Sequence, residues 1–155
     1  MIQRIQSLFL LVAFVLSVIF AVHPISTMML NEKIVAEYLT YGLFSAEEPV
    51  RMMYNTFPVI ILAVVTALLS LITILIFKKR TLQMRLCVYN ILLTLGLVIS
   101  MAVYYFLIKK NFIVLSHAFS YTAIIPFLNI ILIFQAFRGI RRDDLLLKSY
   151  NRLRD

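Results

Sequence analysis

The chain has 155 residues, of which 63% are hydrophobic and only 14% are charged, and its formal net charge is +8. Soluble domains are about half apolar and about a quarter charged, so this composition excludes a soluble enzyme and a disordered tail. The single cysteine, Cys87, excludes a disulfide scaffold. We therefore expect an integral membrane protein.

Four long apolar stretches without Asp, Glu, Lys or Arg predict four membrane-spanning helices. They cover residues 5–22, 57–77, 86–108 and 112–137. At a rise of about 1.5 Å per residue, such lengths suit a hydrocarbon core of about 30 Å. Because backbone polar groups must be paired within each segment in hydrocarbon, the expected fold is an all-α four-transmembrane-helix bundle, a single membrane domain over residues 1–155.

The first connection, residues 23–55, is expected to be a long outer loop. Its middle, residues 34–41, is too apolar for a solvated loop and is rich in the strand formers Val, Ile, Thr and Tyr. We expect a short strand pair with a turn at Gly42, or an amphipathic element on the outer surface, and we favour extended structure. After it, Thr56 and Pro58 are typical of a helix start.

The distribution of Lys and Arg predicts the orientation of the bundle. If both termini lie on one side, that side carries eleven of the fifteen basic residues and the whole net charge of +8. The positive-inside rule then places both termini in the cytoplasm. A cleaved signal peptide is the alternative for residues 5–22, but that segment is long for a signal core and Phe20-Ala21-Val22 is a poor cleavage site.

Polar residues within the predicted spans are the candidates for an intramembrane site. Asn90 and Asn129 are expected at depths that differ by only about 5 Å, so they could meet, with Thr94 and Thr122 nearby. Such a contact is either a hydrogen bond that holds helices together or a binding site for a polar head group. Pro126 in the fourth span predicts a helix kink, with a gating hinge as the minority interpretation.

Cofactor and metal sites have little support in the sequence. His23 and His117 are both expected at outer helix ends, where two histidines could hold a haem, but no further ligation pattern accompanies them. Paired thiols, metal-ligand spacing and phosphate-binding loops are missing. We therefore expect no catalytic residues, no metal and no cofactor.

The segment 138–155 is predicted to be a cytoplasmic tail forming an amphipathic basic helix on the inner leaflet. Leu146, Leu147, Tyr150 and Leu153 share one helical stripe. Basic residues on this side attract anionic lipid, at about 1 kcal/mol each. The expected lipid-binding or partner-binding surface contains Arg4, Lys78, Lys79, Arg80, Arg85, Arg138, Arg141, Arg142, Lys148, Arg152 and Arg154.

Three stretches together resemble a known family. They are residues 1–11, residues 78–91 (Lys-Lys-Arg-Thr-Leu-Gln-Met-Arg-Leu-Cys at its start) and residues 140–154. The full chain is similar to the uncharacterised four-span membrane protein family of Bacteroidota known as domain-of-unknown-function family 4293. The resemblance implies a bacterial inner-membrane location and a retained first helix, and it implies no activity.

All three stretches lie on the predicted cytoplasmic face, where Gln3, Gln6, Gln83 and Asn90 are candidates to pair with groups of the tail. The leading hypothesis is a non-catalytic accessory or scaffold subunit that binds anionic lipids or a membrane-protein complex through this face. The alternatives are a small transporter or carrier of a lipid or another hydrophobic ligand, with a site near Asn90 and Asn129, and, more weakly, a haem or quinone redox subunit. Nucleic acid is not an expected partner.

Overall fold

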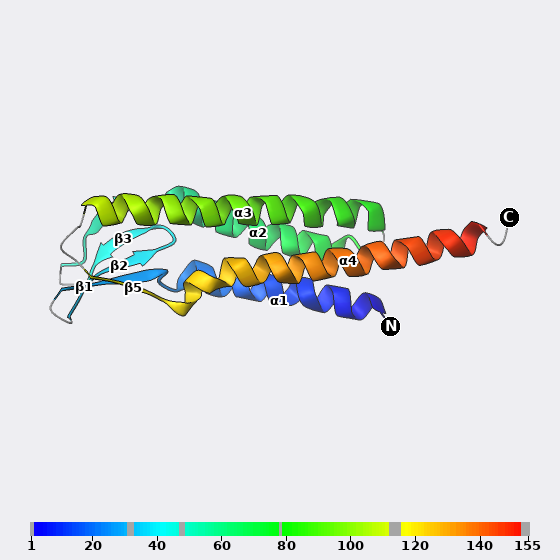
Figure 1. Ribbon diagram of the computed structural model, residues 1–155, viewed down its shortest axis with the longest axis horizontal. Helices are drawn as coiled ribbons and strands as arrows, with labels where there is room; N and C mark the ends of the chain where they lie inside the picture. Colours follow the sequence, from blue (N-terminus) through cyan, green and yellow to red (C-terminus); the bar gives the residue numbers. More distant parts are fainter. Residues whose placement is uncertain (1, 31–32, 47–48, 78, 112–115, 153–155) are drawn as a thin grey trace.

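Four long helices dominate the structure. The computed structural model of the protein describes residues 2–30, 33–46, 49–77, 79–111 and 116–152. The helices are α1 (Ile2–Val22), α2 (Phe57–Leu75), α3 (Arg80–Asn111) and α4 (Ile125–Arg152), and a short 3-10 helix, η1 (Tyr121–Ile124), leads into α4. They run side by side along the long axis of the molecule (Figure 1). Since α1 and α3 both pack against α2 and α4, the bundle has a square cross-section with α1 and α3 at opposite corners.

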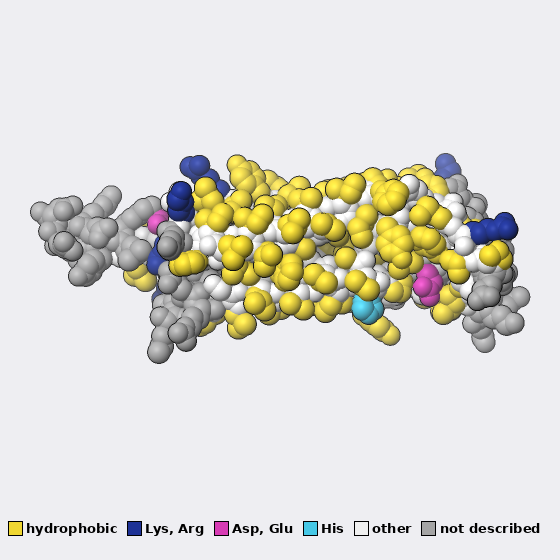
Figure 2. All heavy atoms as spheres, turned by 180° about the vertical axis from the view of Figure 1, so that it is seen from behind, with side chains coloured by type: hydrophobic (Ala, Val, Ile, Leu, Met, Phe, Trp, Pro, Cys, Tyr) yellow, Lys and Arg dark blue, Asp and Glu magenta, His cyan; other side chains and the backbone are white. Residues whose placement is uncertain are grey.

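Each of the four helices contains a segment long and apolar enough to cross a membrane, which confirms the predicted set of apolar helices. These segments are Ile5–Val22, Phe57–Leu75, Arg80–Lys110 and Tyr121–Leu146. Their outward faces carry many exposed Leu, Ile, Val and Phe side chains, and the space-filling view shows this apolar girdle along the helices (Figure 2). Such exposure suits lipid as the surrounding medium.

A five-stranded antiparallel sheet accompanies the bundle, so the all-α prediction is incomplete. Its strands are β1 (Ser26–Leu30), β2 (Lys33–Leu39), β3 (Gly42–Ser45), β4 (Met52–Asn55) and β5 (Ser116–Phe119), in the order β4-β3-β2-β1-β5. The extended structure favoured for residues 34–41 is confirmed, and it is part of a larger sheet than a strand pair.

The turn between β2 and β3 depends on a glycine at its end. Leu39 pairs with Gly42, so Thr40 and Tyr41 form the two-residue connection. A Cβ on Gly42 would lie 3.0 Å from the Phe44 ring and 3.1 Å from the carbonyl oxygen of Tyr54. Gly42 therefore permits the close approach of β3 to its neighbours.

The sheet lies at one end of the bundle, and the two chain termini lie at the other (Figure 1). We call these the sheet end and the terminal end. Between the sheet and the helices is a buried apolar cluster with members from all four long helices. It includes Phe20, Met28, Tyr38, Leu43, Val59, Leu97, Met101 and Ile125.

The start of the fourth span was predicted incorrectly. Residues 116–119 belong to β5, which pairs with β1, and α4 begins only at Ile125. Pro126 is therefore the second residue of α4 rather than a mid-helix residue, and its missing N–H breaks no helical hydrogen bond there. The mid-helix position predicted for Pro126 is thus wrong.

The C-terminal segment also differs from the prediction. It is helical, but it continues α4 without interruption through Gly139 to Arg152. The last turns of α4 project beyond the other three helices along the bundle axis (Figure 1). The separate helix expected on the membrane surface is therefore an extension of the fourth span.

Candidate functional site

Two buried asparagines join the helices in pairs. The Nδ2 group of Asn90 on α3 donates to the Ser70 Oγ on α2 at 2.8 Å. The Nδ2 group of Asn129 on α4 donates to the Ser17 Oγ on α1 at 2.9 Å. In hydrocarbon such interhelical hydrogen bonds contribute about 0.6–2 kcal/mol each.

The two asparagines are not hydrogen-bonded to each other, because the Oδ1 atom of each is without a partner. The helix bounds and a rise of about 1.5 Å per residue place Ser17 about 8 Å and Ser70 about 20 Å from the sheet end. The asparagines bonded to these serines therefore differ in membrane depth by more than the sequence predicted. The reason is that α4 starts later and runs further than predicted.

The two threonines proposed to accompany the asparagines lie apart from one another. Thr94 donates its hydroxyl hydrogen to the backbone oxygen of Asn90 at 2.7 Å, one turn away on the same helix. Thr122, in η1, donates to the backbone oxygen of Pro24 at the sheet end. The four predicted residues thus form no single shared site, and among them only Asn90 and Asn129 bond to a side chain of a neighbouring long helix.

A buried polar contact joins α1 and α4 at the terminal end. The Nε2 group of Gln6 donates to the Asp143 Oδ2 at 2.8 Å, and only 8% of Asp143 is exposed. Beside it, the Nε2 group of Gln83 donates to the backbone oxygen of Thr73 on α2 at 3.2 Å. Pairing of Gln6 with a tail group follows the sequence hypothesis, whereas Gln83 bonds to α2 instead. The side chain of Gln3 lies outside the described residues.

Gly139 allows this contact to form. A Cβ at this position would lie 2.8 Å from the Gln6 Cγ and 3.1 Å from its Nε2. The glycine therefore lets α1 approach α4 closely enough for the Gln6 amide to reach Asp143, one helical turn further along α4.

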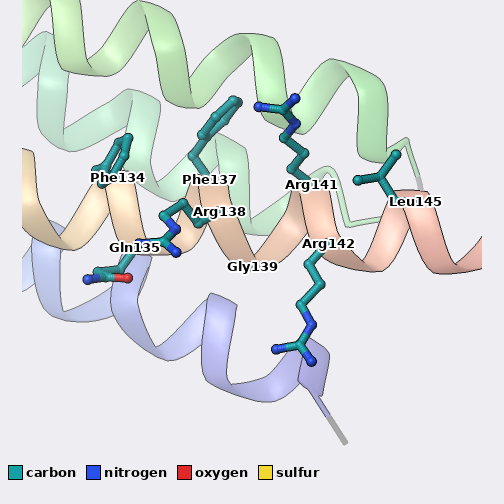
Figure 3. Close-up of a pocket in the computed structure, with 8 residues that line it drawn as sticks. All are labelled: Phe134, Gln135, Phe137, Arg138, Gly139, Arg141, Arg142 and Leu145. Atoms are coloured by element: carbon teal, nitrogen blue, oxygen red, sulfur yellow. The ribbon is translucent and has the colours of Figure 1, made fainter.

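Three exposed arginines of α4 line an open hollow of about 640 Å³ at the same end, which we call the arginine hollow. Arg138, Arg141 and Arg142 line it together with apolar residues that include Phe134 and Leu145. In Figure 3, Arg141 and Arg142 point to opposite sides of α4, and Phe137 lies on the side of Arg141. The hollow thus combines guanidinium groups with apolar surface.

Other basic residues of the predicted surface lie near this end. Lys79 and Arg85 are exposed, and Arg80 is half-buried beside Gln6 and Gln83, where it lines a cavity of about 20 Å³. Positive side chains are visible here in the space-filling view (Figure 2). Five predicted members have side chains outside the described set: Arg4, Lys78, Lys148, Arg152 and Arg154.

The two histidines considered as haem ligands do not both lie at helix ends. His23 follows α1, and its exposed imidazole Nδ1 lies 3.2 Å from the backbone oxygen of Ile19. His117 is in β5 rather than at a helix end, and its side chain lies outside the described residues. In the part of the chain that is described, His, Cys, Asp and Glu form no group of three or more that could hold a metal ion.

Fold and site together define a protein with four apolar helices able to span a membrane, a sheet at one end and buried polar contacts between the helices. The chain belongs to the family described as a domain of unknown function, DUF4293, whose model matches residues 2–153. This match confirms the family resemblance. No curated protein matches the chain.

Proposed function

We propose that the chain is a non-catalytic accessory protein of the bacterial inner membrane, with both termini in the cytoplasm. In this proposal the terminal end binds the head groups of anionic phospholipids. The arginine hollow on α4 is the observation that carries the proposal. The excess of Lys and Arg at this end supports the cytoplasmic orientation.

The position of the arginine hollow along α4 fits a lipid head group. Between Tyr121, where the fourth apolar segment begins, and Arg138, a rise of about 1.5 Å per residue corresponds to about 26 Å. Because a hydrocarbon core is about 30 Å thick, Arg138 would lie at its boundary and the next two arginines in the head-group region. Phe134 and Leu145, both about half exposed, offer contacts for an acyl chain and for glycerol.

The projecting end of α4 supports the accessory role. Leu145, at the edge of the arginine hollow, and Leu146, the next residue, are 57% and 55% exposed. Leucines exposed on a helix that leaves the bundle are a suitable contact for a second membrane protein. In this arrangement the lipid would bind where α4 leaves the bundle, and Leu146 would face the partner.

Replacing all three arginines by glutamine is expected to weaken binding of phosphatidylglycerol by on the order of a hundredfold. Each arginine near anionic lipid contributes about 1 kcal/mol, which is about fivefold in affinity. Native mass spectrometry of the detergent-solubilised protein, with phosphatidylglycerol titrated against phosphatidylcholine, measures this change.

The matched control is the triple variant R138K/R141K/R142K, which keeps the charge. It should bind phosphatidylglycerol within a fewfold of the parent protein. If the glutamine variant retains the parent affinity, or if the parent binds both lipids equally, the head-group proposal is wrong.

A further inference from the structure

A second cavity lies at the sheet end, away from the arginine hollow. Its volume is about 530 Å³, and it is bounded by α3, β5, η1 and the start of α4. The walls are almost entirely apolar, and five of the lining residues are aromatic: Tyr105, Phe106, Phe119, Tyr121 and Phe127. Ligand sites of this size accept molecules with a long apolar portion. We call it the aromatic cavity.

The aromatic cavity opens on the outside of the bundle. Its wall residues Phe106, Phe119, Tyr121 and Phe127 are each at least half exposed, and Tyr121 reaches 90%. Tyr105 and Phe119 hold one wall together, with ring centroids 4.6 Å apart. Because the cavity walls on α3 and α4 belong to segments long and apolar enough to span a membrane, the opening would face lipid in a bilayer.

Two lysines lie on α3 about one helical turn beyond the residues that line the cavity. Ala102, Tyr105 and Phe106 line the cavity, and Lys109 lies seven, four and three positions after them, on the same helix face. Lys110 lies beside it, and both are exposed. Because α3 contains no Asp or Glu, neither ammonium group is neutralised from its own helix.

The apolar cavity and the two lysines near it together favour one kind of ligand. An apolar cavity open to the bilayer suits an acyl chain, and ammonium groups at its rim suit a phosphate. We propose that the aromatic cavity binds an anionic phospholipid of the leaflet at the sheet end. One acyl chain enters between α3 and α4, and the phosphate contacts Lys109 and Lys110.

The chain contains no tryptophan, which permits a direct test. The variant Phe127→Trp places the only indole in the cavity wall, and Phe127 is half exposed, so the larger ring has room. In bilayers containing phosphatidylglycerol or phosphatidylcholine brominated in one acyl chain, we expect phosphatidylglycerol to quench this indole at least twofold more strongly. The added change K109Q/K110Q should remove the difference.

The matched control is Ile99→Trp, an exposed position of α3 outside the cavity. It contacts bulk lipid, so both brominated lipids should quench it equally. Tyr121→Trp reports on the same cavity and replaces Phe127→Trp if that variant does not fold. Equal quenching at the cavity reporter, or a preference that survives K109Q/K110Q, would overturn the proposal.

The test is independent of the function proposed for the terminal end. Replacing Arg138, Arg141 and Arg142 by glutamine should leave the preference at residue 127 unchanged, because those side chains lie at the opposite end of the bundle. A preference abolished by these arginine changes would also contradict the assignment to the aromatic cavity.

Discussion

Replacing Tyr38 by alanine is expected to lower the free energy of unfolding by about 3–5 kcal/mol, as aromatic truncations in cores do. Tyr38 is fully buried between the sheet and the helices, in the cluster that also contains Phe20, Met28 and Leu97. Its loss would leave a cavity at the contact between β2 and the bundle. Reversible denaturation in detergent micelles, followed by circular dichroism, measures the change.

The matched control is Tyr38→Phe, which removes only the hydroxyl group. That oxygen is buried without a hydrogen-bond partner, and burial raises the pKa of the phenol far above its usual value, so it stays neutral. Removing it should leave stability unchanged or raise it by about 1 kcal/mol. If Phe destabilises as much as Ala, the hydroxyl has a structural partner and the apolar explanation fails.

Replacing Gly139 by alanine is expected to cost about 1–3 kcal/mol, the range for overpacking a close contact. The new Cβ would lie 2.8 Å from the Gln6 Cγ and displace the side chain that bonds to Asp143. Asp143 would then remain buried without its amide donor. The same denaturation experiment measures the loss.

Gly96→Ala is the control for this substitution. Gly96 also lies within a helix, but a Cβ there meets nothing within 4 Å. Because alanine favours helix by up to about 1 kcal/mol over glycine, this variant should be neutral or more stable. Equal losses at both positions would show that helix propensity, rather than the approach of α1 to α4, determines the effect.

The helical part of the fold could be predicted from uncharged apolar stretches long enough to span a membrane. In hydrocarbon such a stretch must pair its backbone polar groups within itself, which a helix does. The prediction failed at residues 116–124, where uncharged sequence continues through β5 and η1 into α4. An apolar run does not by itself distinguish a short strand from a helix. Pairing of β5 with β1, distant in sequence, decides the structure there.

The polar contacts could be predicted only in part. Asn90 and Asn129 are predicted to meet each other, but each donates to a serine instead, and those serine partners depend on which helices are neighbours. The contact of Asp143 was not predicted: this residue lies in the segment 138–155, expected to be a separate helix on the inner leaflet, and nothing local indicates that α4 continues and that Gly139 brings Gln6 against it. The aromatic cavity was missed altogether, since its walls come from segments distant in sequence.

The central claim, that the sheet end and the terminal end face opposite sides of the membrane with the termini in the cytoplasm, can be tested by cysteine labelling. Ala46 lies between β3 and β4, and Thr81 is in the first turn of α3; both are exposed, whereas the native Cys87 is fully buried. A membrane-impermeant maleimide should label Ala46→Cys in intact spheroplasts and Thr81→Cys only after lysis. Labelling of Thr81→Cys in intact spheroplasts, with Ala46→Cys protected, would contradict the account.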